Sequence, residues 1–121
     1  MVEFGLTLPV FLMLVFGTLD LGRAIVAYNL ISEGARAGAR AGYIQQTAAA
    51  VSAAVSAETG ALGPGVQVQS AFCTSNPESC SPSDTLPYVR VTVSVPYEPM
   101  VGQVVGGTSI TLRSTCQMYL P

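Results

Sequence analysis

Few side chains in this sequence are of a type that does chemistry. The chain of 121 residues has no histidine, its five basic residues are all arginine, and its net charge is −2. Without histidine it lacks the commonest general base and the commonest metal ligand. No glycine-rich phosphate loop or cluster of carboxylates takes their place. We therefore expect no enzymatic activity, no cofactor and no metal site, and the negative net charge argues against nucleic-acid binding.

The charged side chains of the N-terminal part flank an apolar run. Glu3 precedes residues 4–19, which carry no charge, and Asp20 and Arg23 follow them. As a helix this run would be about 24 Å long, which is short for a hydrocarbon core of about 30 Å. A cleaved secretory signal is disfavoured, because the residue in front of the run is acidic.

Each of these charged groups has two interpretations. A carboxylate in hydrocarbon is costly unless it is protonated or paired, so we expect Glu3 to meet the N-terminal ammonium of a neighbouring subunit on assembly. The alternative is an acid that lies at the level of the lipid headgroups without a partner. Asp20 and Arg23 are three residues apart and could pair within one helix, or with their equivalents on adjacent helices.

The three cysteines differ in their surroundings. Cys73 and Cys80 close the polar segment CTSNPESC, and we expect a disulfide between them, which requires an oxidising compartment. Cys116 falls on the apolar side of an expected strand, where a buried free thiol is the ordinary state. Three cysteines allow three pairings, so a bond from Cys73 or Cys80 to Cys116 stays open. Without histidine, the three do not make a convincing zinc site.

The sequence predicts an α+β fold that begins with one long helix, from Val2 to about Gly42. Pro9 lies inside this helix, where a bend is expected rather than an end. Gly34, Gly38 and Gly42 are four residues apart and form a face that another backbone can approach closely. We interpret this face as an assembly surface.

A small head is expected to follow. A second helix over about 47–59 lies between Thr47, an acceptable N-cap, and Gly60. Strands with alternating apolar residues are expected at about 66–73, 88–96 and 109–120, in an antiparallel sheet with one face covered by helix. Val51 and Val55 of the second helix should lie against that sheet. The domain division is thus a stalk, 1–42, and a head, 43–121.

Several stretches resemble a known family. Val2-Glu3-Phe4, the apolar run with Pro9, FGTLDLGRA (16–24) and EGARAGARAG (33–42) are similar to the N-terminal signature of TadE-like proteins. These are pilin-like subunits of tight adherence (Tad, Flp-type) pili, within the type IV pilus superfamily. VTVSVPYEPM (91–100) and SITLRSTCQMYL (109–120) resemble the family's C-terminal strands, so the likeness covers nearly the whole chain.

The resemblance implies a structural pilin or minor pilin. Such a protein is made with a basic leader, cut by a prepilin peptidase, and held in the bacterial inner membrane with the pilus assembly machinery. It then polymerises through its N-terminal helix, with copies of itself or other pilins, into an extracellular filament for surface attachment. Tad pili usually have a much smaller major pilin, which favours the minor role. The residues expected in assembly are Glu3, Phe4, Pro9, Asp20, Arg23, Gly34, Gly38 and Gly42.

Two departures from the usual pattern concern the start of the chain. The family's glutamate is usually the fifth residue of the mature protein, whereas here it is the third. All arginines follow the apolar run, which by the positive-inside rule would place the head in the cytoplasm, against the disulfide. For the first point, either two residues before Met1 are missing or the processing differs. For the second, a basic leader before Met1, removed before the protein matures, would restore the usual orientation. The alternative function is a single-pass, membrane-anchored extracytoplasmic binding or assembly protein that does not polymerise.

Overall fold

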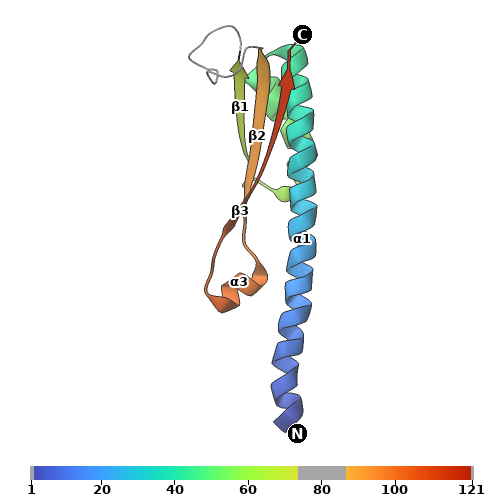
Figure 1. Cartoon of the computed structure of the whole chain (residues 1–121), viewed down its shortest axis with the longest axis vertical. Helices are drawn as coiled ribbons and strands as arrows, with labels where there is room; N and C mark the ends of the chain where they lie inside the picture. Colours follow the sequence, from blue (N-terminus) through green and yellow to red (C-terminus); the bar gives the residue numbers. More distant parts are fainter. Residues whose placement is uncertain (1, 74–86, 121) are drawn as a thin grey trace.

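The computed structural model describes residues 2–73 and 87–120, and it consists of one long helix with a small head packed against part of it. Helix α1 (Val2–Gln45) is the rod of Figure 1, and the head lies beside the half that is closer to its C-terminal end. The N-terminal half therefore projects beyond the head. This confirms the α+β fold with a long first helix, a shorter second helix and a three-stranded sheet.

Helix α1 continues through Pro9 without a break. A proline inside a helix removes one backbone hydrogen bond, the one to the carbonyl of Gly5, but the helix does not end there, as the sequence predicted. The helix continues three residues past Gly42 and ends at Gln45. Gln46 then takes a left-handed conformation, with φ of 51°, which turns the chain toward the second helix.

Helix α2 (Ala48–Thr59) has the predicted bounds, with Thr47 at its N-cap and Gly60 at its C-cap. Thr47 is extended, as an N-cap residue is, although its side chain makes no capping hydrogen bond. Val51 and Val55 are fully buried in one core with the inward valines of the sheet, as predicted. Both valines also contact the glycine face of α1, because that face has no side chains to hold α2 away.

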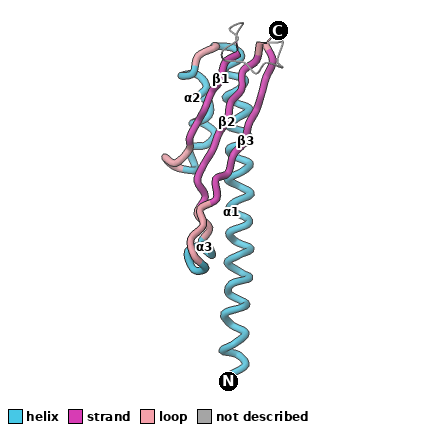
Figure 2. The backbone as a smooth tube through the Cα atoms, turned by 60° about the vertical axis from the view of Figure 1, so that its left-hand side comes forward, coloured by secondary structure: helices cyan, strands magenta, loops and turns pink. Residues whose placement is uncertain are grey.

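The sheet is antiparallel, with strand order β1-β2-β3. Its strands are β1 (Gln67–Cys73), β2 (Tyr88–Tyr97) and β3 (Ile110–Tyr119). Both helices lie on one side of it, as Figure 2 shows, and the inward valines of the central strand are buried: Val89, Val91, Val93 and Val95. The opposite face carries polar pairs, including Thr92 with Thr115 and Arg90 with Gln117. The predicted alternation along the strands is therefore confirmed.

The end of the β2–β3 hairpin forms a projection that the sequence did not predict. We call residues 97–112 the arm. It contains a short helix, α3 (Met100–Val105), and extends past the head alongside the N-terminal half of α1 (Figures 1 and 2). A 3-10 turn, η1 (Gly60–Leu62), joins α2 to the sheet.

Candidate functional site: the free half of helix α1 and its contact with the arm

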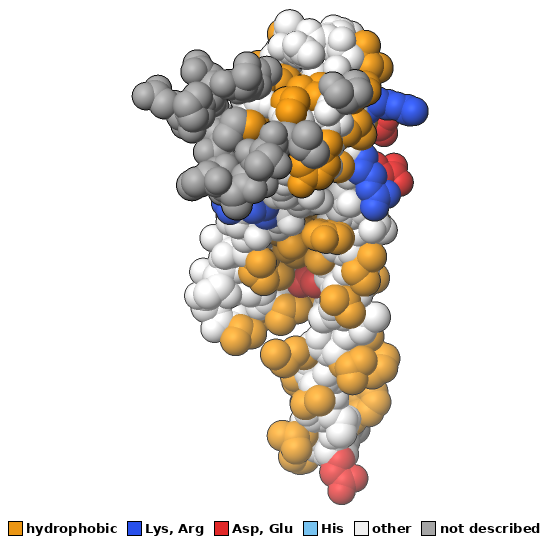
Figure 3. Space-filling model, turned by 45° about the horizontal axis from the view of Figure 1, so that its top comes forward, with side chains coloured by type: hydrophobic (Ala, Val, Ile, Leu, Met, Phe, Trp, Pro, Cys, Tyr) orange, Lys and Arg blue, Asp and Glu red, His pale blue; other side chains and the backbone are white. Residues whose placement is uncertain are grey.

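The N-terminal half of α1 is apolar on all sides and exposed. Figure 3 shows apolar side chains around this half and over the arm, whereas most charged side chains gather around the head. Phe4, for example, is 72% exposed, and Pro9 is exposed as well. By length and composition, helix α1 as a whole is long and apolar enough to cross a membrane, and none of its most apolar 18-residue window is buried. A helix that is apolar all round normally lies in lipid or in a packed assembly.

The two threonine hydroxyls of this half have partners within the helix. The hydroxyl of Thr7 donates to the Glu3 carbonyl oxygen at 3.1 Å, and that of Thr18 donates to the Leu14 carbonyl oxygen at 2.9 Å. Such back-bonding removes the need for water around a hydroxyl. The segment between Glu3 and Asp20 is thus suited to apolar surroundings.

Glu3 lies in the first turn of α1 and is exposed. Within residues 2–73 and 87–120 its carboxylate makes no ion pair or hydrogen bond. An acid in the first turn is favourably placed toward the positive end of the helix dipole. Its pairing with a neighbouring subunit stays a prediction.

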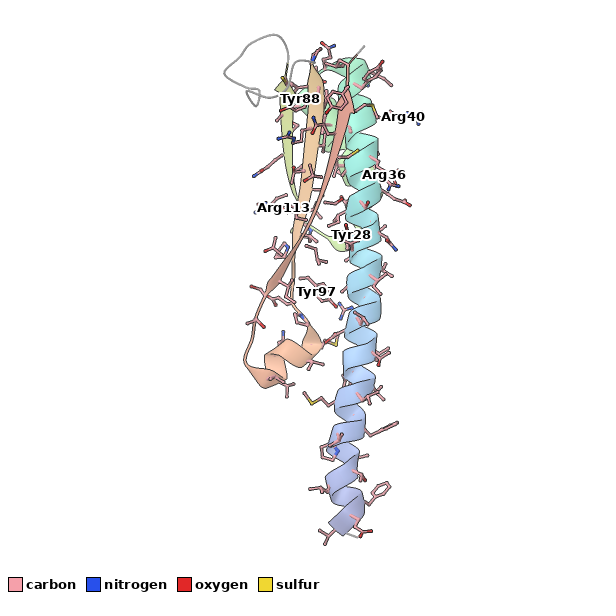
Figure 4. All side chains as sticks on the ribbon, viewed as in Figure 1. Tyr28, Arg36, Arg40, Tyr88, Tyr97 and Arg113 are labelled. Atoms are coloured by element: carbon pink, nitrogen blue, oxygen red, sulfur yellow. The ribbon has the colours of Figure 1, made fainter. Side chains whose placement is uncertain are left out.

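Asp20 joins α1 to the arm. Its Oδ2 accepts a hydrogen bond from the backbone N–H of Val101 in α3 at 2.8 Å, and its carbonyl oxygen accepts one from the Tyr97 hydroxyl at 2.9 Å. Tyr97 points from the hairpin toward α1 in Figure 4. Asp20 is only 6% exposed, and its Oδ1 is buried without a hydrogen-bond partner. We call these two hydrogen bonds the Asp20 latch.

Of the two pairings considered for Asp20 and Arg23, the one inside a single helix does not occur in this structure. Both residues are described, and no ion pair joins them. Arg23 is exposed, whereas the Asp20 carboxylate turns toward the backbone N–H at the start of α3. An N–H in the first turn of a helix has no partner within that helix, so a carboxylate is a favourable acceptor. The latch also leaves Asp20 buried by its own chain.

An apolar cleft of about 570 Å³ lies between α1 and α3, next to the latch. On one side are side chains from successive turns of α1, and on the other are side chains of α3. Its lining residues are Pro9, Leu12, Met13 and Phe16 from α1, with Met100, Val101, Val104 and Val105 from α3. The arm therefore faces the apolar half of α1 with apolar side chains of its own.

The glycine face of α1 is buried inside the head. A Cβ atom at Gly38 would lie 2.7 Å from Val55 Cγ2, 3.2 Å from Val91 Cγ1 and 3.3 Å from Val51 Cγ1. A Cβ atom at Gly34 would lie 2.9 Å from Thr59 Cγ2 of α2. One at Gly42 would lie 2.8 Å from Val89 Cγ1 of β2. The predicted close packing is right, but the neighbours belong to the same chain. These glycines therefore do not form a free assembly surface.

The comparison with protein families concerns this same helix. Residues 1–40 match the TadE family, described as TadE-like protein. The N-terminal third of the chain is TadE-like. No curated protein and no solved structure matched.

The TadE-like segment contains most of the residues that the sequence singled out. Glu3, Phe4, Pro9, Asp20 and Arg23 lie within it, as do Gly34 and Gly38, whereas Gly42 lies two residues beyond it. The structure brings only Gly34, Gly38 and Gly42 onto one buried face, and it places Asp20 against the arm. Glu3, Phe4 and Pro9 lie apart on the free half of α1.

Sequence reasoning missed the arm's part in this site. Tyr97 and Val101 contact the TadE-like segment, yet they are separated from Asp20 by 77 and 81 positions. The sequence contains one feature that could have indicated this contact: residues 99–112 carry no charge, as is true of residues 4–19. Arg36 and Arg40 point away from the sheet on the outer side of α1 (Figure 4), as exposed arginines do.

Cys73 and Cys116 lie in the part of the sheet that is remote from the latch. Cys73 is 3% exposed, although the other odd-numbered residues of β1 are exposed. It is in register with Tyr88, which is also buried and contacts Arg90 and Tyr119 with its ring. Cys80 lies outside the described residues, so the Cys73–Cys80 disulfide stays a prediction. Cys116 is a free thiol but only partly buried, because β3 is an edge strand.

Proposed function

We propose that this chain is a structural subunit, a pilin or minor pilin, of a Tad-type pilus and that it polymerises through the N-terminal half of α1. One observation carries the proposal: the TadE-like segment presents an exposed helix that is apolar on all sides and has almost no partner in its own chain. Removing such a surface from water is strongly favourable, so a bilayer or a bundle of equivalent helices is its natural surrounding.

The proposed sequence of environments is a stay in the bacterial inner membrane followed by transfer to a filament at the cell surface. Inner-membrane assembly machinery and a prepilin peptidase are the partners that this route requires. Surface attachment is the role that a Tad-type pilus implies. The family match favours a structural role over an enzymatic one. Among the described residues, no group of three or more histidine, cysteine, aspartate or glutamate side chains could hold a metal ion.

A second candidate is a membrane-anchored protein that does not polymerise. The observation in its favour is the arm, because α3 lies over part of the helix surface that packing in a fibre would use. The two candidates differ in where the protein is recovered. A subunit appears in fibres sheared from cells, whereas an anchored protein is released only by detergent.

The test is fibre formation by the Glu3→Ala variant. An unpaired carboxylate is costly in an apolar fibre core, so Glu3 directs assembly only if a neighbour pairs with it. We expect Glu3→Ala to remain in the membrane fraction and to be lost from sheared fibres, while wild type is found in both. Glu58→Ala is the matched control, because Glu58 is an exposed acid on α2, away from α1's free half. Normal fibre yield from Glu3→Ala would contradict the proposed role.

A further inference from the structure

The uncharged parts of α1 and of the arm lie at the same level of the molecule. Residues 4–19 of α1 and residues 99–112 of the arm carry no charge, and charges reappear at Asp20 and Arg23 in α1 and at Glu98 and Arg113 in the hairpin. Asp20 is bonded to Val101, while Arg23 and Glu98 line one hollow beside it. The charged residues of these two segments, which are far apart in sequence, therefore end at the same level of the molecule.

The arm exposes its apolar side chains below this boundary. Val104 is 87% exposed and Val105 is 67% exposed, and Met100 is more than half exposed. Figure 1 shows that α3 lies across the direction of α1, which is the orientation of a helix in the plane of a membrane surface when α1 crosses that membrane.

The depth of the arm also fits a membrane surface. The cleft that α3 lines runs along α1 from Phe16, about 6 Å below Asp20 along the helix axis, to Pro9, about 16 Å below it, so its upper part lies at the depth of the membrane interface. Interfacial helices bury their apolar face by about 5–10 Å. Tyr97 lies at the boundary itself, where tyrosine is favoured because its ring is apolar and its hydroxyl is polar.

One N–H group at the start of α3 and one carbonyl group near its end have partners outside the regular helix bonds. The N–H of Val101 donates to Asp20, and Pro99 has no N–H to satisfy. At the other end, the N–H groups of Gly106 and Gly107 both donate to the carbonyl oxygen of Gly102. Unpaired backbone groups are what normally keeps a short helix out of an apolar environment. The Asp20 latch thus removes one such unpaired group, the Val101 N–H, at the start of α3.

From these observations we infer that the arm is a second membrane-contacting element, which seats Met100, Val104 and Val105 at the boundary between headgroups and acyl chains while α1 is in the bilayer. The occupant of its apolar face is lipid. The inference rests on the membrane stage of the proposed function and not on polymerisation.

Tryptophan fluorescence tests this directly, because the chain contains no tryptophan. Full-length Val104→Trp is reconstituted in phosphatidylcholine vesicles that contain lipids brominated either near the headgroup or near the chain ends. Phe11→Trp is the reference for the bilayer-embedded helix, and Gln69→Trp, on the exposed outer face of β1, is the reference for the head. Val105→Trp provides a second arm position if Val104→Trp does not fold.

We expect several-fold stronger quenching of Val104→Trp than of Gln69→Trp, with the shallow bromolipid more effective than the deep one. Quenching no stronger than that of Gln69→Trp would overturn the inference and leave the proposed function intact. A blue-shifted but unquenched signal would overturn it too, because a second protein copy would then cover the arm. Failure to quench Phe11→Trp would overturn both the inference and the membrane stage.

Discussion

The glycine at position 38 offers the sharpest test of how α1 is used. The change is Gly38→Ala, and its effect is a balance of two terms. Alanine in place of glycine in a helix interior stabilises the folded state by about 1 kcal/mol. The new methyl group would lie 2.7 Å from Val55 Cγ2, and its other two neighbours, Val91 and Val51, are also β-branched. Forcing an extra methyl group into a well-packed core costs about 1–3 kcal/mol.

These neighbours have little room to give way. Val51, Val55 and Val91 are all fully buried, and valine has few alternative rotamers. They also come from two different elements, so moving α2 does not relieve the contact with β2. We therefore expect Gly38→Ala to be neutral or to destabilise the fold by up to about 2 kcal/mol, the difference between the overpacking cost and the helix gain.

Gly22→Ala is the matched control. Gly22 lies in the interior of the same helix, and a Cβ atom there would meet nothing within 4 Å. This variant keeps the helix gain without the crowding, so its free energy of unfolding should exceed that of Gly38→Ala by about 1–3 kcal/mol. The assay is urea or thermal unfolding of the full chain in detergent, followed by circular dichroism.

The result also separates the two interpretations of the glycine face. If Gly38 served only assembly between subunits, Gly38→Ala would raise the stability of the solubilised protein by about 1 kcal/mol, as Gly22→Ala does, and would reduce only fibre yield. Equal stability of Gly38→Ala and Gly22→Ala would refute the packing described above. A lower stability of Gly38→Ala, with fibre loss in proportion, would support it.

Two further predictions concern the latch and the cysteines. Asp20→Ala leaves the Val101 N–H without its acceptor, which costs about 1–3 kcal/mol, and Tyr97→Phe removes one hydrogen bond worth about 0.5–1.5 kcal/mol. Hydrogen exchange at Val101 and neighbouring arm amides should be faster in Asp20→Ala than in wild type, and unchanged exchange would show that the latch does not hold the arm. For the cysteines, peptide mapping without reductant should find Cys73 linked to Cys80, with Cys116 open to alkylation. A linked peptide containing Cys116 would contradict this pairing.

The parts of the fold that local sequence determines were predictable. Thr47 and Gly60 lie at the two ends of α2 as the sequence predicted, although Thr47 makes no capping hydrogen bond and Gly60 keeps a right-handed helical conformation, with φ of −54°. The alternating valines of β2 predicted its buried face, since side-chain direction in a strand has a period of two. Helix α3 was missed because valine and glycine, which make up most of MVGQVV, do not favour a helix on their own.

The site was harder to predict because its contacts are distant in sequence. Asp20 and Arg23 suggested a local ion pair, but the stronger partner of Asp20 is a backbone N–H 81 positions away. The spacing of Gly34, Gly38 and Gly42 correctly indicated a close approach. Such spacing says that a backbone or side chain comes near and does not say from which chain it comes. Only the arrangement of α2 and β2 assigns that neighbour.

These contacts divide α1 into surfaces with different uses. From Ile31 to Gly42 the inner face of α1 packs against the head, and Asp20 is hydrogen-bonded to the arm. A proposed fibre must therefore be held together mainly by residues 2–19, on the sides that α3 does not cover. When the subunit leaves the bilayer for the fibre, Val104 and Val105 lose their lipid contacts together with α1. In the fibre those valines need a protein surface in place of lipid, so the arm belongs at an interface between subunits rather than on the fibre's wet exterior.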